Sequence, residues 1–329
     1  MKIAVLGDGG WGTTLAILLS MKGCKVTLWG AFPKYIDFLS QKRENKKFLP
    51  GIRIPNSVLL TYNIKAAVTD NDIIVLAIPS QYMRKVLKKI PQQAGKRIYV
   101  SVSKGIENKT LLRMSEVIEQ ELGRVDLAVL SGPTISYEVA RGMPTTAVVA
   151  SKKPGISKFV QGAFNTHEFR VYNSSDVTGV ELGGSLKNIV AIAAGICDGF
   201  GFGPNSKAAI LTRGLVEITR LGTAMGAKKE TFSGLSGLGD MVTTCISTHG
   251  RNRWLGEQIG KGKLLREILR HTEMAIEGVP TAKSAYLLAK KHKVEMPITE
   301  QIYKILYKDK SPNLAVKELL LRPMKAETI

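Results

Sequence analysis

The stretch KIAVLGDGGWGTTLAILLS, residues 2–20, decides the fold of the first half of the chain. Its first five residues, KIAVL, form an apolar run that is typical of a strand buried on both faces of a parallel sheet. The glycine-rich sequence GDGGWG follows at once, and a helical stretch comes next. Gly7, Gly9 and Gly12 therefore form a G-x-G-x-x-G motif between a strand and a helix, which is the setting that a dinucleotide-binding motif requires.

Each position of this motif has a physical role in binding a dinucleotide. Gly7 allows the tight turn, Gly9 lets the backbone approach a pyrophosphate, and Gly12 lets the helix pack closely on the strand. The N–H groups of Gly10 and Trp11 are expected to face the phosphates at the positive end of the helix. The motif therefore predicts a site for NAD(H) or NADP(H).

The residues after the second predicted strand, 25–30, are expected to lie near the adenosine ribose. An acidic residue there favours NAD, but the sequence has Trp29, Gly30 and Ala31, with neither an acid nor an arginine. We interpret Lys34 as a solvated loop lysine. The sequence therefore does not choose between NAD and NADP, and both cofactors are expected to work.

Asp8 does not fit this simple scheme. A carboxylate beside a pyrophosphate is repulsive unless it points to solvent. A strong preference for NADH would indicate that an acidic group, Asp8 or Asp37, reaches the ribose after all.

Further apolar runs alternate with helical stretches and predict additional strands of the same sheet. They lie at residues 72–80, 97–107, 126–133, 145–151 and 169–174. This alternation favours an α/β fold, a Rossmann-type doubly wound sheet domain with a mixed sheet. The pattern then becomes helical, with no convincing strand. We therefore expect a dinucleotide-binding domain over residues 1–176 and an all-helical, substrate-binding C-terminal domain over residues 177–329.

The composition is that of an ordinary globular protein. The chain has 329 residues, of which 44% are hydrophobic and 22% charged, enough for a large core and two domains. No apolar run approaches the ~20 residues that span a bilayer, and the N-terminus has no secretory pattern. We therefore expect a cytoplasmic protein without stable membrane insertion. The three cysteines are widely spaced and the four histidines show no ligand spacing, so free thiols and no metal site are expected.

The formal net charge of +20 is the unusual feature of the composition. A strongly basic chain can bind nucleic acid, an anionic membrane or phosphorylated ligands. The lysines, however, are spread over the whole chain, and no alternation of basic and aromatic residues marks a base-stacking surface. We interpret the charge as a lysine-rich solvated surface and expect no nucleic-acid partner.

The stretch from Glu181 to Gly214 is rich in glycine and alanine and carries two lysines, Lys187 and Lys207. Apolar residues follow Lys187 on nearly every side of the predicted helix, which is typical of a buried helix. Lys187 and Asn188 are predicted to begin this helix. A lysine in such a place either reaches solvent with its ammonium group or is held for use.

Other polar residues are expected at the carboxyl ends of the strands, where ligands bind in open α/β sheets. Lys104 follows one strand, and Pro133 follows another as a predicted first helical residue whose neighbours would present free N–H groups. In the helical half, Asp240 follows a glycine-rich loop, and Arg251 and Asn252 stand at a predicted helix start, which suits a phosphate. Singly, each could equally be a cap or a solvated residue. Together they favour a phosphorylated substrate.

These motifs carry a resemblance to a known family. The blocks GDGGWGTTLA, IPSQYMR, SKGIE, LSGPTISYEVARG, ELGGSLKNIVAIAAGICDGFGFGPNSKAA, GLSGLGD, TCISTHGRNRWLG and MAIEGVPTA stand in the order and spacing of the bacterial NAD(P)-dependent glycerol-3-phosphate dehydrogenases. The chain resembles that family from Lys2 to about Leu321.

The resemblance implies a role for each matching residue. Lys187 takes the position of the proton acceptor. The implied substrate-binding residues are Lys104, Gly132, Thr134, Lys187, Asp240, Gly250, Arg251 and Asn252. The implied cofactor-binding residues are Gly7, Gly9, Gly10, Trp11, Gly12, Lys104, Ser136, Arg251, Ala275 and Glu277. It also implies a homodimer and a supply of glycerol 3-phosphate for phospholipid synthesis.

The implied reaction interconverts sn-glycerol 3-phosphate and dihydroxyacetone phosphate, with Lys187 accepting or donating the proton. Desolvation and the like charge of Lys104 are expected to favour its neutral amine. Two departures from the family pattern stand out. Gly250 replaces the usual serine, which leaves only a backbone contact there, and the usual arginine after the second strand is missing, which leaves the preference for NADP open.

Two alternatives remain at this stage. A 6-phosphogluconate or β-hydroxyacid dehydrogenase has the same arrangement of domains and a catalytic lysine, but its asparagine stands one helical turn after that lysine, where this chain has Ala191. A non-enzymatic nucleotide-sensing or nucleic-acid-binding protein would explain the basic charge. It would leave Lys187 and Asp240 without a purpose.

Overall fold

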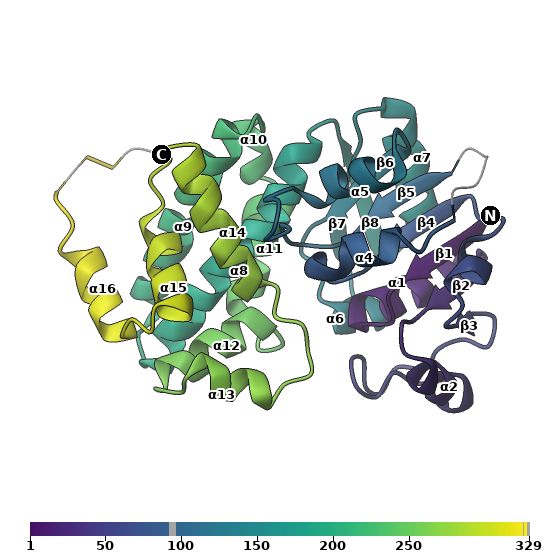
Figure 1. The fold of residues 1–329 in the computed structure, drawn as a ribbon, viewed down its shortest axis with the longest axis horizontal. Helices are drawn as coiled ribbons and strands as arrows, with labels where there is room; N and C mark the ends of the chain where they lie inside the picture. Colours follow the sequence, from purple (N-terminus) through teal and green to yellow (C-terminus); the bar gives the residue numbers. More distant parts are fainter. Residues whose placement is uncertain (92–96, 325, 328–329) are drawn as a thin grey trace.

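A mixed β-sheet flanked by helices and a separate group of helices make up the two halves of the molecule (Figure 1). The structure is a computed structural model that describes residues 1–91, 97–324 and 326–327. Its strands are β1 (Lys2–Leu6), β2 (Lys25–Trp29), β3 (Leu59–Thr61), β4 (Ile73–Leu76), β5 (Ile98–Ser101), β6 (Asp126–Ser131), β7 (Thr145–Ala150) and β8 (Phe169–Ser174). They form one sheet in the order β3-β2-β1-β4-β5-β6-β7-β8. Only the β6–β7 pair is antiparallel among the described strands.

The helices before and around the sheet are α1 (Gly10–Met21), α2 (Pro33–Lys42), α3 (Ile64–Val68), η1 (Ser80–Tyr82), α4 (Met83–Leu87), α5 (Met114–Leu122), α6 (Ser136–Ala140) and α7 (Pro154–Phe164). Those of the second half are α8 (Val177–Gly199), α9 (Pro204–Ala224), α10 (Lys229–Phe232), η2 (Leu235–Gly239), α11 (Asp240–Ile246), α12 (Arg251–Gly260), α13 (Leu265–Arg270), α14 (Gly278–Lys291), α15 (Pro297–Tyr307) and α16 (Pro312–Leu320).

The expected fold class is confirmed: a Rossmann-type sheet is followed by helices alone within the described part of the second half. The first six strands have the order 3-2-1-4-5-6 of a doubly wound dinucleotide-binding sheet. One strand was missed, β3, because it has only three residues and lies at the sheet edge. The last strand ends at Ser174 and α8 begins at Val177.

The sheet holds the glycine-rich turn in place because its central strands are buried on both faces. β1 pairs with β2 on one side and β4 on the other, and separate apolar clusters cover the two faces. Gly7 follows β1 with a φ of +121°, and a side chain there would collide with the carbonyl of Ala77 after β4. Gly12 packs against the carbonyl of Gly7. The turn therefore needs glycine at both positions.

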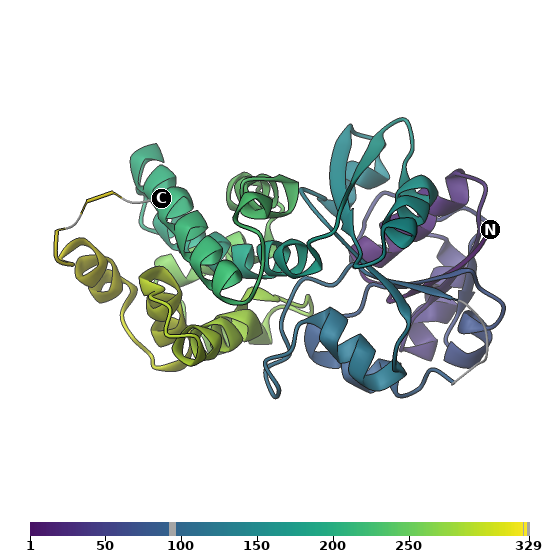
Figure 2. The same cartoon turned by 90° about the horizontal axis from the view of Figure 1, so that it is seen from above.

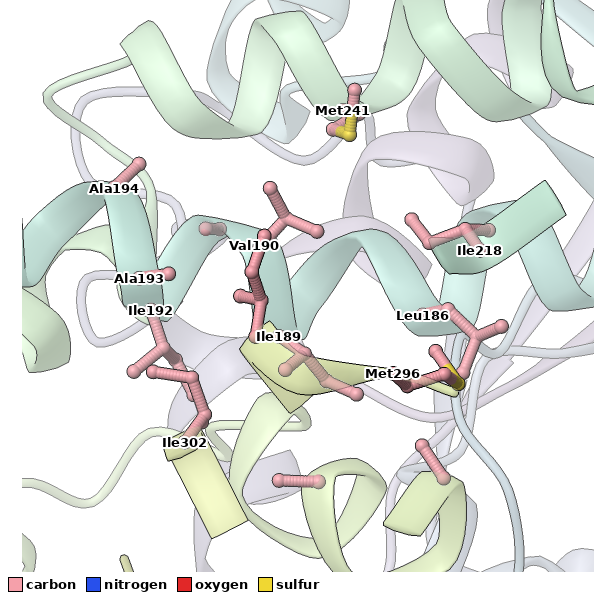
Figure 3. Packing of buried hydrophobic residues seen from close by; sticks show 14 of the residues in the cluster. Leu186, Ile189, Val190, Ile192, Ala193, Ala194, Ile218, Met241, Met296 and Ile302 are labelled. Carbon is pink, nitrogen blue, oxygen red and sulfur yellow. The ribbon is translucent and has the colours of Figure 1, made fainter. Parts of the chain in front are cut away.

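The second half is built around α8, whose apolar side chains contact the surrounding helices on several sides (Figure 3). Leu186, Ile189 and Val190 lie with Ile218 of α9 and Met296 in one apolar cluster. Among the described helices, α8 alone is long and apolar enough to cross a membrane. It is entirely buried inside the protein, which explains its composition as that of a core helix.

The expectation that Lys187 and Asn188 begin this helix is wrong. α8 begins ten residues earlier, at Val177, where Asp176 caps it by accepting a hydrogen bond from the N–H of Gly179 (2.9 Å). The glycine pair Gly183–Gly184 looks like a loop in the sequence. These two glycines instead let α8 lie against Ser236 and Ser131 without side chains between them. Lys187 therefore lies in the middle of α8, a helix packed against Ser236 and Ser131.

Two smaller expectations also need correction. Pro133 is not a first helical residue, because α6 begins only at Ser136. The glycine-rich segment before Asp240 is not an open loop, because Leu235–Gly239 forms a π-helical turn that leads directly into α11.

Helices α8 and α12 are in direct backbone contact along a row of glycines. A side chain on Gly195 or Gly199 of α8 would collide with the carbonyl of Arg253 or Glu257. Likewise, side chains on Gly256 and Gly260 of α12 would meet the carbonyls of Ile192 and Ile196. We call these four glycines the glycine contact, and it fixes α12 against α8.

The two halves meet along the start of α8 (Figure 2). Glu181 of α8 is buried and accepts hydrogen bonds from Arg113 (2.7 Å) and from the backbone N–H and the hydroxyl of Ser115 (2.7 and 2.6 Å) at the start of α5. Burial raises the pKa of the Glu181 carboxyl, while Arg113 and Ser115 oppose that effect. The contacts of Glu181 with Arg113 and Ser115 join the sheet half to α8, the helix that carries Lys187.

Candidate functional site

The Asp240 carboxylate stands at the start of α11 and holds two lysines from different halves of the molecule. Lys104, after β5, contacts Oδ2 at 2.7 Å, and Lys187 of α8 contacts Oδ1 at 2.9 Å. Asp240 is 2% exposed and Lys187 6%. We call these three residues the Asp240 centre. Two lysine side chains thus share one carboxylate in a site that is largely shielded from solvent.

Thr244 completes the surroundings of Lys187 and was missed in the sequence. Its hydroxyl accepts a hydrogen bond from the Lys187 ammonium. Thr244 lies four residues after Asp240 on the same helix, so both side chains project from one face. The i, i+4 spacing of two polar residues was the signal that could have identified it.

Lys104 links the Asp240 centre to the edge of the sheet. Its ammonium also donates to the carbonyl of Gly132 (2.9 Å) and lies 3.3 Å from the hydroxyl of Thr134. Both acceptors follow β6, at the carboxyl end where ligands bind in this fold. Three residues predicted to bind substrate are therefore in mutual contact.

The electrostatics of Lys104 follow from this position. Burial lowers the pKa of Lys104 to about 8, and the positive charges of Lys187 and Arg251 act in the same direction. Asp240 opposes the change by stabilising the charged form. An ammonium group with a pKa near neutrality can both bind an anion and exchange a proton.

Arg251 and Asn252 stand at the start of α12, as predicted, with Gly250 as the residue before the helix. Asn252 is 9% exposed, donates to the side-chain oxygen of Asn188 (2.9 Å) and accepts from the N–H of Gly278 (2.9 Å). Arg251 donates to the carbonyl of Ala275 (2.7 Å) and leaves further N–H groups for a ligand. A cation at a helix start in this arrangement suits a phosphate group.

Arg253 has a different role from its neighbour Arg251. Its guanidinium contacts Asp198 near the end of α8 at 2.6 Å, and Lys207 contacts the same carboxylate at 2.5 Å. The structure therefore places Arg253 and Lys207 in an ion-pair group that joins three helices. Neither belongs to the Asp240 centre.

The glycine-rich turn lies in the sheet half, at the start of α1. Trp11 packs its ring on Phe169, and its indole Nε1 is buried without a hydrogen-bond partner among the described residues. The carbonyl of Ser136, at the start of α6, accepts a hydrogen bond from Thr14 of α1 (3.0 Å). The predicted cofactor residues Gly9, Gly10 and Ser136 are thus brought together at one helix start.

Glu277 connects the helical half to the sheet half through Ser80. Its carboxylate accepts hydrogen bonds from the backbone N–H and the hydroxyl of Ser80, at 2.8 and 2.5 Å. Burial raises the pKa of Glu277, and Ser80 and Arg251 act against that effect. Ser80 was not singled out in the sequence. The contact places Ala275, Glu277 and Arg251 beside the loop that follows β4.

The described residues also include side chains of the types that bind metals or take part in redox chemistry. Among the described residues, no group of three or more His, Cys, Asp or Glu side chains could hold a metal ion. Cys24, Cys197 and Cys245 are free thiols. Burial raises the pKa of Cys245 to about 12, which makes this thiol a poor nucleophile.

Comparison with known proteins places this arrangement among dehydrogenases. Residues 2–156 match the N-terminal, and residues 176–317 the C-terminal, family model of NAD-dependent glycerol-3-phosphate dehydrogenase. The chain is 49% identical over 332 residues to glycerol-3-phosphate dehydrogenase [NAD(P)+] from Citrifermentans bemidjiense, covering 100% of this chain and 99% of that protein. It is 50% identical over 328 residues to the enzyme of the same name from Thermoanaerobacter sp. X514, with 99% of both covered.

A solved structure is similar over the same extent. The crystal structure of glycerol-3-phosphate dehydrogenase from Coxiella burnetii shares 40% sequence identity with this chain at a TM-score of 0.94, covering 98% of this chain and 99% of that one.

Proposed function

The chain belongs to the NAD(P)-dependent glycerol-3-phosphate dehydrogenases, and from that premise we propose how its own residues carry the reaction. The enzyme interconverts sn-glycerol 3-phosphate and dihydroxyacetone phosphate with NAD(H) or NADP(H). The observation that carries the proposal is the Asp240 centre, where one buried carboxylate holds Lys104 and Lys187. The family assignment argues against both alternatives, a 6-phosphogluconate or β-hydroxyacid dehydrogenase and a non-enzymatic nucleotide-sensing or nucleic-acid-binding protein.

The residues around the glycine-rich turn fit a dinucleotide. Gly7 and Gly12 form a tight turn, the space beside Gly9 is open to a pyrophosphate, and the buried Nε1 of Trp11 lacks a partner among the described residues. Gly9 and Gly10 at the start of α1 offer N–H groups, with Ser136 beside them. When it is bound, the nicotinamide supplies the hydride in the direction of reduction.

Lys187 is proposed as the proton donor and acceptor. In reduction, its ammonium Nζ gives a proton to the oxygen that becomes the secondary hydroxyl, and in oxidation the neutral amine takes it back. Asp240 and Thr244 hold Nζ in one position, so the proton is transferred from a fixed place.

Lys104 and the start of α12 are proposed to bind the substrate at its two ends. Lys104, with Gly132 and Thr134, stands on the side of the sheet and supplies a positive charge near the reacting oxygen. Arg251 and Asn252 bind the phosphate, together with the backbone of Gly250. Binding energy from the phosphate then positions the reacting carbon, although that group takes no part in the chemistry.

The cofactor and substrate residues meet at Arg251. It contacts the carbonyl of Ala275, and its charge acts on Glu277, which is bonded to Ser80 of the sheet domain. We infer that these three residues contact the bound cofactor and couple its binding to that of the phosphate.

The proposal is tested by initial rates of NADH and NADPH oxidation with dihydroxyacetone phosphate, alongside dihydroxyacetone without the phosphate. We expect the unphosphorylated ketone to react slower by roughly 10²-fold or more, because the α12 contacts are lost. Comparable rates with both ketones would contradict the phosphate role of Arg251 and Asn252. They would leave the family assignment untouched.

We further infer that the enzyme supplies glycerol 3-phosphate for phospholipid synthesis as a cytoplasmic homodimer. The family assignment supports this role, and α8, the one described helix long and apolar enough to cross a membrane, is buried within the protein. The metabolic role is tested by growth of a bacterial strain that requires glycerol 3-phosphate. Expression of this chain should relieve that requirement, whereas a Lys187→Ala variant should not. Light scattering of the purified protein tests for the dimer.

A further inference from the structure

One carboxylate oxygen of Asp8, in the glycine-rich turn, is shielded from solvent, although an acid beside a pyrophosphate would be expected to point to solvent. Its carboxylate lies against Gly30, the residue that follows β2, and a Cβ on Gly30 would overlap its Cγ and Oδ2. Oδ2 is buried and has no hydrogen-bond partner within the part of the chain that the structure describes. One oxygen of this half-buried carboxylate is therefore left without a hydrogen-bond donor among the described residues.

The position of this carboxylate is informative because of where β2 ends. In doubly wound sheets, an acidic side chain at the end of the second strand accepts hydrogen bonds from the adenosine ribose of NAD. This chain has Gly30 and Ala31 there, with no acid. The Asp8 carboxylate stands where a side chain of residue 30 would begin. A residue of the glycine-rich turn thus brings the missing acid to the same place from the neighbouring strand.

The surroundings hold Asp8 in this position. Its backbone carbonyl accepts a hydrogen bond from the buried amide of Asn45 (2.8 Å), which also bonds Thr13 of α1 (2.7 Å). The N–H of Gly30 donates a hydrogen bond to the carbonyl of Thr61, which fixes the end of β2. Asn45 and the strand end therefore position the carboxylate before any ligand arrives.

The nearby groups only partly compensate for the burial of the Asp8 carboxylate. Burial raises the pKa of Asp8, and its own backbone N–H and the charge of Lys47 only oppose this in part. Lys47 is itself paired with Glu273 across the gap between the two halves. A buried carboxylate oxygen without a donor is unfavourable, so Oδ2 of Asp8 can accept a hydrogen bond from a ligand.

We propose that Asp8 binds the adenosine ribose of the cofactor and makes this enzyme prefer NADH to NADPH. The proposal rests on the proposed placement of the dinucleotide at the glycine-rich turn. The 2′-hydroxyl of NADH donates to the carboxylate, whereas the 2′-phosphate of NADPH brings a like charge to the same place. Asp8 thereby determines specificity without contacting the reacting atoms.

Lysines on the same edge limit this preference. Lys34, Lys46 and Lys47 surround a hollow with Tyr35 and Phe38 on and after α2. Their ammonium groups are exposed and attract a 2′-phosphate weakly. We therefore expect a preference of moderate size, in which NADPH still serves as a cofactor.

The test compares NADH and NADPH in the wild type and in Asp8→Asn, which keeps the shape and removes the charge. Both kcat/KM with dihydroxyacetone phosphate and the Kd of each cofactor, from quenching of protein fluorescence, are measured. We expect the wild type to favour NADH by about tenfold or more, and Asp8→Asn to reduce that ratio by about tenfold. Asp37→Asn, an exposed acid of α2, is the control and should change the ratio less than about twofold.

Two further measurements separate the possible failures. Reduced nicotinamide mononucleotide lacks the adenosine half, so its Kd should be the same in Asp8→Asn as in the wild type. Equal weakening of this fragment and of NADH would mean that Asp8 supports the turn and does not bind ribose. A cofactor ratio that stays within about threefold in Asp8→Asn would overturn the proposal. Failure of the proposed function would appear separately, as a wild type that binds NADH but reduces no ketone.

Discussion

The buried carboxylate of Asp240 and the half-buried carboxylate of Asp8 differ in how their oxygens are paired. Asp240 holds the ammonium groups of Lys104 and Lys187 at 2.7 and 2.9 Å. Oδ2 of Asp8 has no partner within the described residues. A buried charge without a partner is costly. Both oxygens of Asp240 are paired in the free protein, whereas we propose that Oδ2 of Asp8 gains its hydrogen bond from the cofactor. The difference suggests that the chemistry is assembled in advance, whereas cofactor choice is left to binding.

The largest expected effect tests the Asp240 centre. Lys187→Ala should lower turnover by roughly 10²–10⁴, the usual contribution of a placed acid–base group. Lys187→Arg should not restore activity, because a guanidinium does not lose its proton in this range. Stopped-flow or steady-state turnover measures both.

The other lysine of the same segment provides the control for this prediction. Lys207→Ala removes an ammonium that pairs with Asp198, which keeps Arg253 as a partner. Its turnover should stay within about threefold of the wild type, as expected for a partly exposed ion pair. If Lys187→Arg retained more than about a tenth of the activity, proton transfer by Lys187 would be wrong.

The next effect separates binding of the phosphate from the chemistry. Arg251→Ala should raise the KM for dihydroxyacetone phosphate by the equivalent of about 2–4 kcal/mol, because a charge-assisted contact is lost. Arg253→Ala removes the same charge two residues later on the same helix, but its guanidinium faces Asp198. Its KM should change little. A similar rise in KM for both variants would indicate a general loss of positive charge.

The comparison of the two carboxylates also predicts opposite changes in stability. Asp240→Asn leaves two buried ammonium groups facing each other, so the free energy of unfolding should fall by about 2–4 kcal/mol. Asp8→Asn removes a half-buried charge whose Oδ2 has no donor among the described residues, so the free energy of unfolding should rise by about 1 kcal/mol. Urea unfolding of the free proteins measures both. Destabilisation by Asp8→Asn would mean that its carboxylate has a partner in the free protein.

The smallest effect is a dependence on pH. The pKa of Lys104 is about 8, below that of a free lysine, so its ammonium loses its charge as the pH rises through that value. If the charge binds substrate, KM should be constant below about pH 8 and rise by up to about tenfold per unit above it. Lys104→Arg keeps its charge throughout and should flatten this profile. An unchanged break in that variant would assign it to another group.

The sequence was sufficient where the structure depends on local pattern. β1 follows from an apolar run, and the turn follows from Gly7 and Gly12, where no side chain would fit. The start of α12 at Arg251 follows in the same way from local signals. Family resemblance brought Lys104, Lys187 and Asp240 to one expected site, and the structure has them in contact.

The sequence failed where a contact joins distant segments. The true start of α8 was hidden because Gly183 and Gly184 look like a loop until Ser236 and Ser131 are seen to pack on them. The position of Asp8 over Gly30 depends on how two strand ends meet, which no local pattern encodes. Spacing alone could have revealed Thr244, one helical turn after Asp240.

The glycine contact between α8 and α12 has a consequence for enzyme engineering. Lys187 is carried by α8 and Arg251 by α12, and the two backbones touch at Gly195 and Gly256. The separation between the proposed proton-transfer group and the proposed phosphate anchor is therefore set by main-chain contact, which tightly packed interiors do not let relax. If these roles hold, we expect substrate length to be limited by residues that no substrate touches. A designer seeking activity on a longer phosphorylated ketone should alter these glycines before the pocket itself.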